Sequence, residues 1–292
     1  MLELVQNNVV VEPIINNEVD KLFFADVKKM PAEQVMPGFH FNSYNNTVVQ
    51  VATENGPVIC NNCSDGYLLI PNREIFPVLE QEMKKFGLTK IKRRVVDHSV
   101  FFADYDFLDD NKKIQIAKGD VIFPRISIEN SYNSKYLFKI NACFMRQVCT
   151  NGMCLPVEDS SFNTILSHSK GNISKIVAES LEGIYAFFEG AAEIAGEYEV
   201  LMEKKVAYSD IEDCVQSILK KTNSLLSYKD GIVERIKQEN AMGIEVNMFS
   251  IYNGINYFLQ PEHNEYITPD NVKRRQMDEK ILDVVFDMSD VA

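Results

Sequence analysis

Hydrophobic and polar positions along the chain follow two different periods, which meet near residue 156. Before that point apolar residues tend to alternate with polar ones, and after it they recur every three or four residues. The change predicts an α+β fold with an N-terminal antiparallel sheet and a short helix, followed by a C-terminal helical portion. We expect a β-rich domain with one short helix over 1–156, a linker or loop over 157–171, a helical region over 172–260 and an acidic tail over 261–292.

The alternating pattern predicts six strands. Short ones are expected at 47–53, 57–60 and 66–70, and longer ones at 97–108, 121–129 and 136–148. Each longer segment has one apolar and one polar face; in the first of them, Tyr105 and Phe107 alternate with Asp104 and Asp106. This is typical of an antiparallel sheet with one buried face.

The helical pattern predicts one short helix within the first half and four helices after it. The short helix spans 73–86, with Asn72 as its N-cap. The others are expected at about 172–206, from the capping-box pair Ser209 and Glu212 to Lys221, at 228–240 and at 247–259.

Charge is distributed unevenly along the 292 residues, whose formal net charge is −12. Residues 1–156 hold 17 Lys and Arg against 18 Asp and Glu, whereas residues 157–292 hold 13 against 24. No window approaches the ~18 apolar residues of a membrane span, and the N-terminus has no secretory signal pattern. The six cysteines are therefore expected to be free thiols in a reducing compartment, the cytoplasm.

A run of six cations lies within eleven residues, with no acid between Glu82 and Asp97. Basic clusters near an aromatic side chain, here Phe86, suit the backbone of a nucleic acid, although a solvated helix end is the alternative. We expect the first two cations at the end of the short helix and the other four on the following loop and strand start, so that all six converge. They are Lys84, Lys85, Lys90, Lys92, Arg93 and Arg94.

Arg146 is a further nucleic-acid-binding candidate. It falls on the apolar face of its predicted strand, between Phe144 and Val148, where an unpaired charge would be costly. It should pair with an acid or project into a functional groove.

Three other chemistries have only part of the pattern that each would need. Cys60 and Cys63 have zinc-knuckle spacing, but the second pair, Cys149 and Cys154, does not. Cys149 with His98 or His168 would be a nucleophile and base, and a cluster of aspartates could hold a divalent metal. We therefore expect no catalytic residue, metal or cofactor, and regard an enzyme as the less favoured class. The aspartates are Asp104, Asp106, Asp109 and Asp110.

Three stretches carry a distinctive order and spacing: GYLLIPNREIF (66–76), GDVIFPRISIENSYNSKYLFKINACFMRQVCTNGMCLP (119–156) and SIYNGINYFL (250–259). The most specific part combines Asn130-Ser131-Tyr132 with Arg146 and the sequence VCTNG (148–152). Together they resemble the phage/plasmid-like protein family, a domain-of-unknown-function family of bacteriophages, prophages and mobile elements. The resemblance implies a mobile-element context in a bacterial host cell, and it implies no reaction.

These observations favour a non-enzymatic DNA-metabolism protein of a phage or mobile element. We expect it to bind single-stranded nucleic acid, to assist annealing or recombination, to form a homo-oligomer and to have no membrane partner. The alternative is an acidic interaction protein that binds a host or phage protein, of an anti-defence or DNA-mimic type, through the acidic second half.

Overall fold

The fold is given by a computed structural model that describes residues 12–40, 42, 44–117, 120–146, 152–154, 163–166, 172–259 and 271–290. The chain divides into two compact units that interleave along the sequence. Unit 1 contains residues 1–109, 125–142 and 159–188, and unit 2 contains residues 110–124, 143–158 and 189–292. Each unit therefore takes segments from both sides of residue 156. The predicted α+β class is confirmed.

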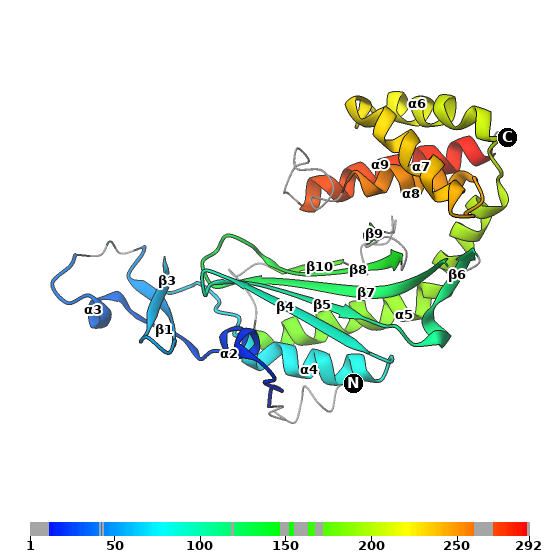
Figure 1. Ribbon diagram of the computed structural model, residues 1–292. Helices are drawn as coiled ribbons and strands as arrows, with labels where there is room; N and C mark the ends of the chain where they lie inside the picture. The colour runs from blue at the N-terminus through cyan, green and yellow to red at the C-terminus, as the bar shows by residue number, and fades with distance from the viewer. Residues whose placement is uncertain are drawn as a thin grey trace. The chain divides into compact units, whose positions relative to one another are not determined.

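The described elements are shown in Figure 1. The helices are α2 (Glu18–Phe23), α3 (Ala32–Val35), α4 (Asn72–Lys84), α5 (Ile173–Glu203), α6 (Ile211–Thr222), α7 (Lys229–Ala241), α8 (Met248–Tyr257) and α9 (Asn271–Asp290). The strands are β1 (Val27–Pro31), β2 (Thr47–Val51), β3 (Val58–Cys63), β4 (Lys90–Val96), β5 (Val100–Asp106), β6 (Ile114–Ala117), β7 (Asp120–Ser131), β8 (Phe138–Arg146), β9 (Gly152–Cys154) and β10 (Asn163–Leu166).

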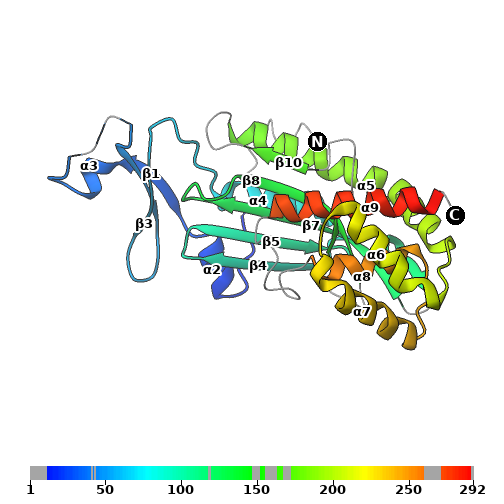
Figure 2. The same ribbon diagram turned by 90° about the horizontal axis from the view of Figure 1, so that it is seen from above.

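The strands form a small sheet and a large one. The small sheet has the order β1-β2-β3, and the large one has the order β10-β8-β7-β5-β4, with β6 paired to β7 and β9 to β8. Strands β4, β5, β7 and β8 lie side by side in Figure 2. Three residues, Asp97, His98 and Ser99, connect β4 to β5. Asp97 and His98 have φ angles of 50° and 56°, and the N–H of Ser99 donates to the carbonyl of Val96 (3.1 Å).

One face of the large sheet forms the core of unit 1. Alternate side chains of β5 and β7 are buried there, including Phe101, Tyr105 and Ile128, as their spacing predicts. Helix α4 packs on this face, where Phe76 contacts Phe138 of β8 with ring centroids 6.3 Å apart. The first half of α5 joins it through Phe188, whose ring lies 4.7 Å from that of Phe107. The opposite face carries Asp104 and Asp106 of β5 and Arg125, Ser127 and Glu129 of β7.

A buried hydrogen-bond network fixes the start of α4 against β7. The amide of Asn130 donates to the carbonyl of Ile70 (2.8 Å) and to Oδ1 of Asn72 (2.7 Å). Asn72 in turn donates to the carbonyl of Phe23 at the end of α2, and its backbone N–H donates to the hydroxyl of Tyr132 (both 2.9 Å). The predicted N-cap role of Asn72 is therefore wrong: Asn72 is the first helical residue, and its side chain ties three segments together.

Unit 2 is mainly a group of four helices, α6, α7, α8 and α9 (Figure 2). Nearly every residue of α8 is buried. Its Gly254 permits close contact with α7, since a Cβ atom there would lie 2.5 Å from Cγ1 of Ile236. Tyr252 and Asn256 both donate to the buried carboxylate of Asp278, at 3.0 and 2.7 Å. These bonds hold α9, which begins inside the predicted acidic tail.

Several local expectations are corrected. Residues 66–70 form no strand, and the predicted loop 157–171 contains β10. The capping box at the start of α6 does not form, because Ser209 bonds to Asp210 and Glu212 pairs with Lys229. Helix α2 and strand β1 were not predicted, and β4 is a complete strand where only a strand start was expected.

The network around Asn130 predicts a clear loss of stability on its removal. Asn130→Ala leaves the buried acceptors of Ile70 and Asn72 without their donor, at about 1–3 kcal/mol for each unsatisfied group. The urea midpoint, followed by far-UV circular dichroism, should therefore fall markedly. Asn62→Ala, at an exposed position of β3, should leave it nearly unchanged. Equal midpoints for the two variants would contradict the structural role of Asn130.

Candidate nucleic-acid interface

The alternation of strand β4 divides the basic run between two faces. Lys90, Lys92 and Arg94 are exposed, whereas Arg93 lies between them on the opposite face, which is turned toward α2 and α4. Successive side chains of a strand point to opposite sides of its sheet, so these neighbours in sequence cannot share one surface. The expectation that all six cations converge therefore fails at Arg93.

Arg93 is held in a buried ion-pair cluster, with a side chain only 5% exposed. Its Nη1 donates to Oδ1 of Asp20 in α2 (2.7 Å), and its Nη2 donates to Oε1 of Glu80 in α4 (2.6 Å). The hydroxyl of Tyr105 donates to the same Glu80 oxygen (2.8 Å), and the guanidinium lies 4.8 Å from the ring centroid of Phe24. This cluster joins two helices to the strand.

The electrostatics of the cluster keep Arg93 charged. Burial alone would lower the pKa of Arg93, but the charge of Glu80 and the hydrogen bonds outweigh it, and the pKa is raised. Burial, with the negative charge of Glu80 acting in the same direction, raises the pKa of Tyr105 well above its ordinary value. Arg93 is thus a structural cation, and its burial keeps it from the solvent-facing surface that a phosphate could reach.

Lys84, the last residue of α4, and Lys85, which follows it, are both exposed but differ in their partners. Lys85 donates to both carboxylate oxygens of Glu82, each at 2.7 Å, and Tyr185 of α5 donates to one of them (2.8 Å). Lys84 is exposed in the last turn of the helix, where the helix dipole also favours a cation. Of the pair, Lys84 is the one whose charge faces solvent without a carboxylate partner among the described residues.

The acids opposite β4 are engaged by strand β7. Asp104 accepts a hydrogen bond from Ser127 (2.7 Å), and Asp106 is bound in a bidentate manner by Arg125, with Nη2 and Oδ2 3.0 Å apart. Lys90 and Lys92, which lie directly across from these acids, form no ion pair within the described part of the chain. The row formed by Lys90, Lys92 and Arg94 on β4 therefore has no ion-pair partner within the described part of the chain.

An aromatic pair extends this row, and sequence reasoning missed it. The guanidinium of Arg94 lies 4.3 Å from the ring centroid of Phe102 on β5, directly across the ladder. Phe102 in turn contacts Tyr136, with ring centroids 5.8 Å apart, and Tyr136 is 39% exposed. The signal in the sequence was the even spacing of Phe102 from Asp104 and Asp106, which places all three on the polar face.

A family model for a domain of unknown function, DUF932, matches residues 61–241, more than half of the chain. The chain belongs to the DUF932 family. The matched segment includes strand β4, the Asn130 network and the Arg94–Phe102–Tyr136 group. No curated protein and no solved structure shows significant similarity to the chain.

The other candidate chemistries find little support in the described part of this DUF932 protein. Cys60 and Cys63 lie within strand β3 rather than in a knuckle turn, and Cys60 Sγ lies 3.8 Å from the carbonyl of His98. No three His, Cys, Asp or Glu side chains gather there as metal ligands would. Cys149, His168 and the side chains of Cys154 and Arg146 lie outside the described residues, so the predicted role of Arg146 stays a prediction. None of the described helices combines the length and apolar character that a membrane crossing needs.

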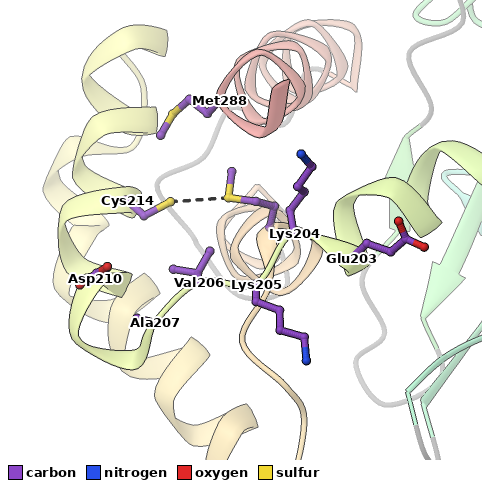
Figure 3. A pocket seen from close by; sticks show the side chains of 9 residues that line it. Glu203, Lys204, Lys205, Val206, Ala207, Asp210, Cys214 and Met288 are labelled. Carbon is purple, nitrogen blue, oxygen red and sulfur yellow. Dashed lines mark hydrogen bonds between the residues drawn. The ribbon is translucent and has the colours of Figure 1, made fainter. Parts of the chain in front are cut away.

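A hollow of about 440 Å³ in unit 2 contains a cysteine but no activated nucleophile. Figure 3 shows Cys214, Met288, Lys204 and Lys205 among the side chains that line it. The thiol of Cys214 lies 3.8 Å from the sulfur of Met248. Burial raises the pKa of Cys214 to about 11, so the thiol stays protonated at neutral pH and is a poor nucleophile.

The two faces of β4 predict opposite effects of neighbouring substitutions on stability. Arg93→Ala leaves Asp20 and Glu80 buried without their cation, and should cost about 3–5 kcal/mol of unfolding free energy. Lys92→Ala removes an exposed charge and should change it by no more than about 0.5 kcal/mol. Urea denaturation of both variants measures the difference. If Arg93→Ala were as stable as Lys92→Ala, the buried cluster would be wrong.

Proposed function

We propose that this protein binds single-stranded nucleic acid through the exposed face of β4. The observation that carries the proposal is the row of three cations, Lys90, Lys92 and Arg94, which have no carboxylate partner among the described residues. The acids on the neighbouring strand, Asp104 and Asp106, bond toward β7 instead.

The spacing of the row suits a phosphate backbone. Alternate residues of an antiparallel strand recur every ~6.8 Å, so the three cations span ~14 Å. A stacked strand rises ~3.4 Å per nucleotide along its axis, so the row lies alongside about four nucleotides. Lys84 at the end of α4 supplies a further exposed charge close by in sequence.

The acidity of the whole chain does not argue against local binding. Most of the excess negative charge belongs to residues 157–292, outside the basic run. Exposed charges more than ~8 Å apart are largely screened at physiological salt, so the immediate surroundings of β4 dominate. The same acidity supports the alternative, a surface for a protein partner, which would take the lead if nucleic acid does not bind.

The biological setting is part of the proposal. The resemblance to proteins of phages and mobile elements supports a role in their DNA metabolism, within the cytoplasm of a bacterial host. Assistance to annealing or recombination would need several copies along a strand, and therefore a homo-oligomer.

The proposal predicts a salt-dependent affinity that resides in β4. For wild-type protein and a fluorescent single-stranded oligonucleotide, affinity measured by anisotropy should fall steeply as salt rises. The variant Lys90→Ala/Lys92→Ala/Arg94→Ala should flatten the slope of log affinity against log salt by about 2, because each phosphate contact to a single strand adds about 0.7. Its urea midpoint should stay close to that of wild type, since all three side chains are exposed.

A matched variant tests whether position or mere charge matters. Lys28→Ala/Lys220→Ala/Lys221→Ala removes three exposed lysines outside the basic run and changes the net charge equally. Its salt slope should equal that of wild type. Absence of wild-type binding at low salt, or equal slopes for the two triple variants, would refute the role of β4.

A further inference from the structure

We propose that Arg94, Phe102 and Tyr136 form a platform on which bases of the bound strand stack. The proposal rests on the proposed function. It names the part of the nucleic acid that would contact the Arg94 end of the row Lys90, Lys92 and Arg94. Its occupant is an unpaired base of single-stranded DNA or RNA.

The three side chains form a continuous group on the polar face of the sheet. The Arg94 guanidinium covers Phe102 at 4.3 Å, and Phe102 meets Tyr136 at 5.8 Å with the ring planes 72° apart. Arg94 is exposed, and Tyr136 retains 39% of its surface in solvent. The guanidinium of Arg94 and the ring of Tyr136 are thus both partly exposed, and both contact the ring of Phe102 between them.

The exposed tyrosine is held in place by its backbone. Ser131, the last residue of β7, donates its hydroxyl to the carbonyl of Tyr136 (2.8 Å) and accepts the backbone N–H of Tyr136 (3.0 Å). The segment therefore closes on the strand end, and the ring has a fixed base. A ligand that stacks on a pre-positioned ring loses less binding free energy to ordering of the loop.

The chemistry of the group selects an unpaired base. Bases stack favourably on aromatic rings and on guanidinium planes, largely regardless of sequence. Paired bases inside a duplex already stack on each other and do not offer their faces. Lys90 and Lys92 continue from Arg94 along the same face and complement the phosphates of the same strand.

The experiment compares an oligothymidylate with an abasic strand of the same length and charge, using wild-type protein and fluorescence anisotropy. We expect wild type to bind the strand with bases at least about tenfold more tightly, because one stacked base is typically worth about a factor of ten or more. Tyr136→Ala should lose most of this ratio and keep the salt slope, because no charge changes. Tyr136→Phe should retain it. Tyr44→Ala, which removes a tyrosine that is 80% exposed, is the matched control and should behave as wild type.

The outcomes separate the two proposals. Equal affinity of wild type for both strands, with a steep salt slope, would overturn the stacking platform while leaving phosphate binding by β4 intact. A tenfold ratio that survives in Tyr136→Ala would also overturn the platform, since the bases would then be recognised elsewhere. Failure of wild type to bind either strand at low salt would overturn both proposals.

Discussion

The burial of Arg93 is the constraint on which the proposed surface depends. Its guanidinium is the only described link between β4 and the carboxylates of both Asp20 and Glu80, so it fixes which face of the strand turns toward α2 and α4. A shift of one residue would exchange the faces: Ile91 and Val95 would turn outward, and the row Lys90, Lys92 and Arg94 would turn toward the helices, where the two carboxylates now partner a single cation. The outward orientation of Lys90, Lys92 and Arg94 is therefore a consequence of the inward orientation of Arg93. A change in the pairing register of β4 would disrupt both.

The tripeptide Asn130-Ser131-Tyr132 serves both faces of the same sheet. Asn130 and Tyr132 bond inward to the first residue of α4, whereas Ser131 between them bonds to the backbone of Tyr136 on the polar side. These bonds give this part of the most specific motif of the sequence a role in the scaffold. They also connect the packing of α4 to the placement of an exposed aromatic ring.

The features that could be predicted from the sequence are those that depend on the periodicity of neighbouring residues. The opposed faces formed by Tyr105 and Phe107 against Asp104 and Asp106, and the helices of unit 2, follow from the pattern of neighbouring residues. The role of Arg93 could not be predicted, because Asp20 lies 73 positions away and belongs to a helix with only six residues. The contact between Phe102 and Tyr136 depends on a loop closed by Ser131. Asn72 resembled an N-cap because a rule based on neighbouring residues does not take account of its distant partners, Asn130 and Phe23. The basic run could be predicted because a cluster of charges is visible in neighbouring residues. The burial of Arg93 could not, because it depends on partners far along the chain.

Cations on the outer strand of a sheet also have a simpler use, which is to prevent edge-to-edge pairing with another molecule. β4 is at the end of the order of the large sheet, so Lys90 and Lys92 would serve that purpose in any case. Protection of an edge does not account for Phe102 and Tyr136, because exposed aromatic surface promotes association rather than opposing it. Nor does it require Arg94 to lie over a ring when a lysine would repel a neighbouring edge equally well. A row of cations beside a partly exposed aromatic group complements a nucleic-acid strand, which has charged phosphates and unpaired bases. Protection of a sheet edge would require the cations alone.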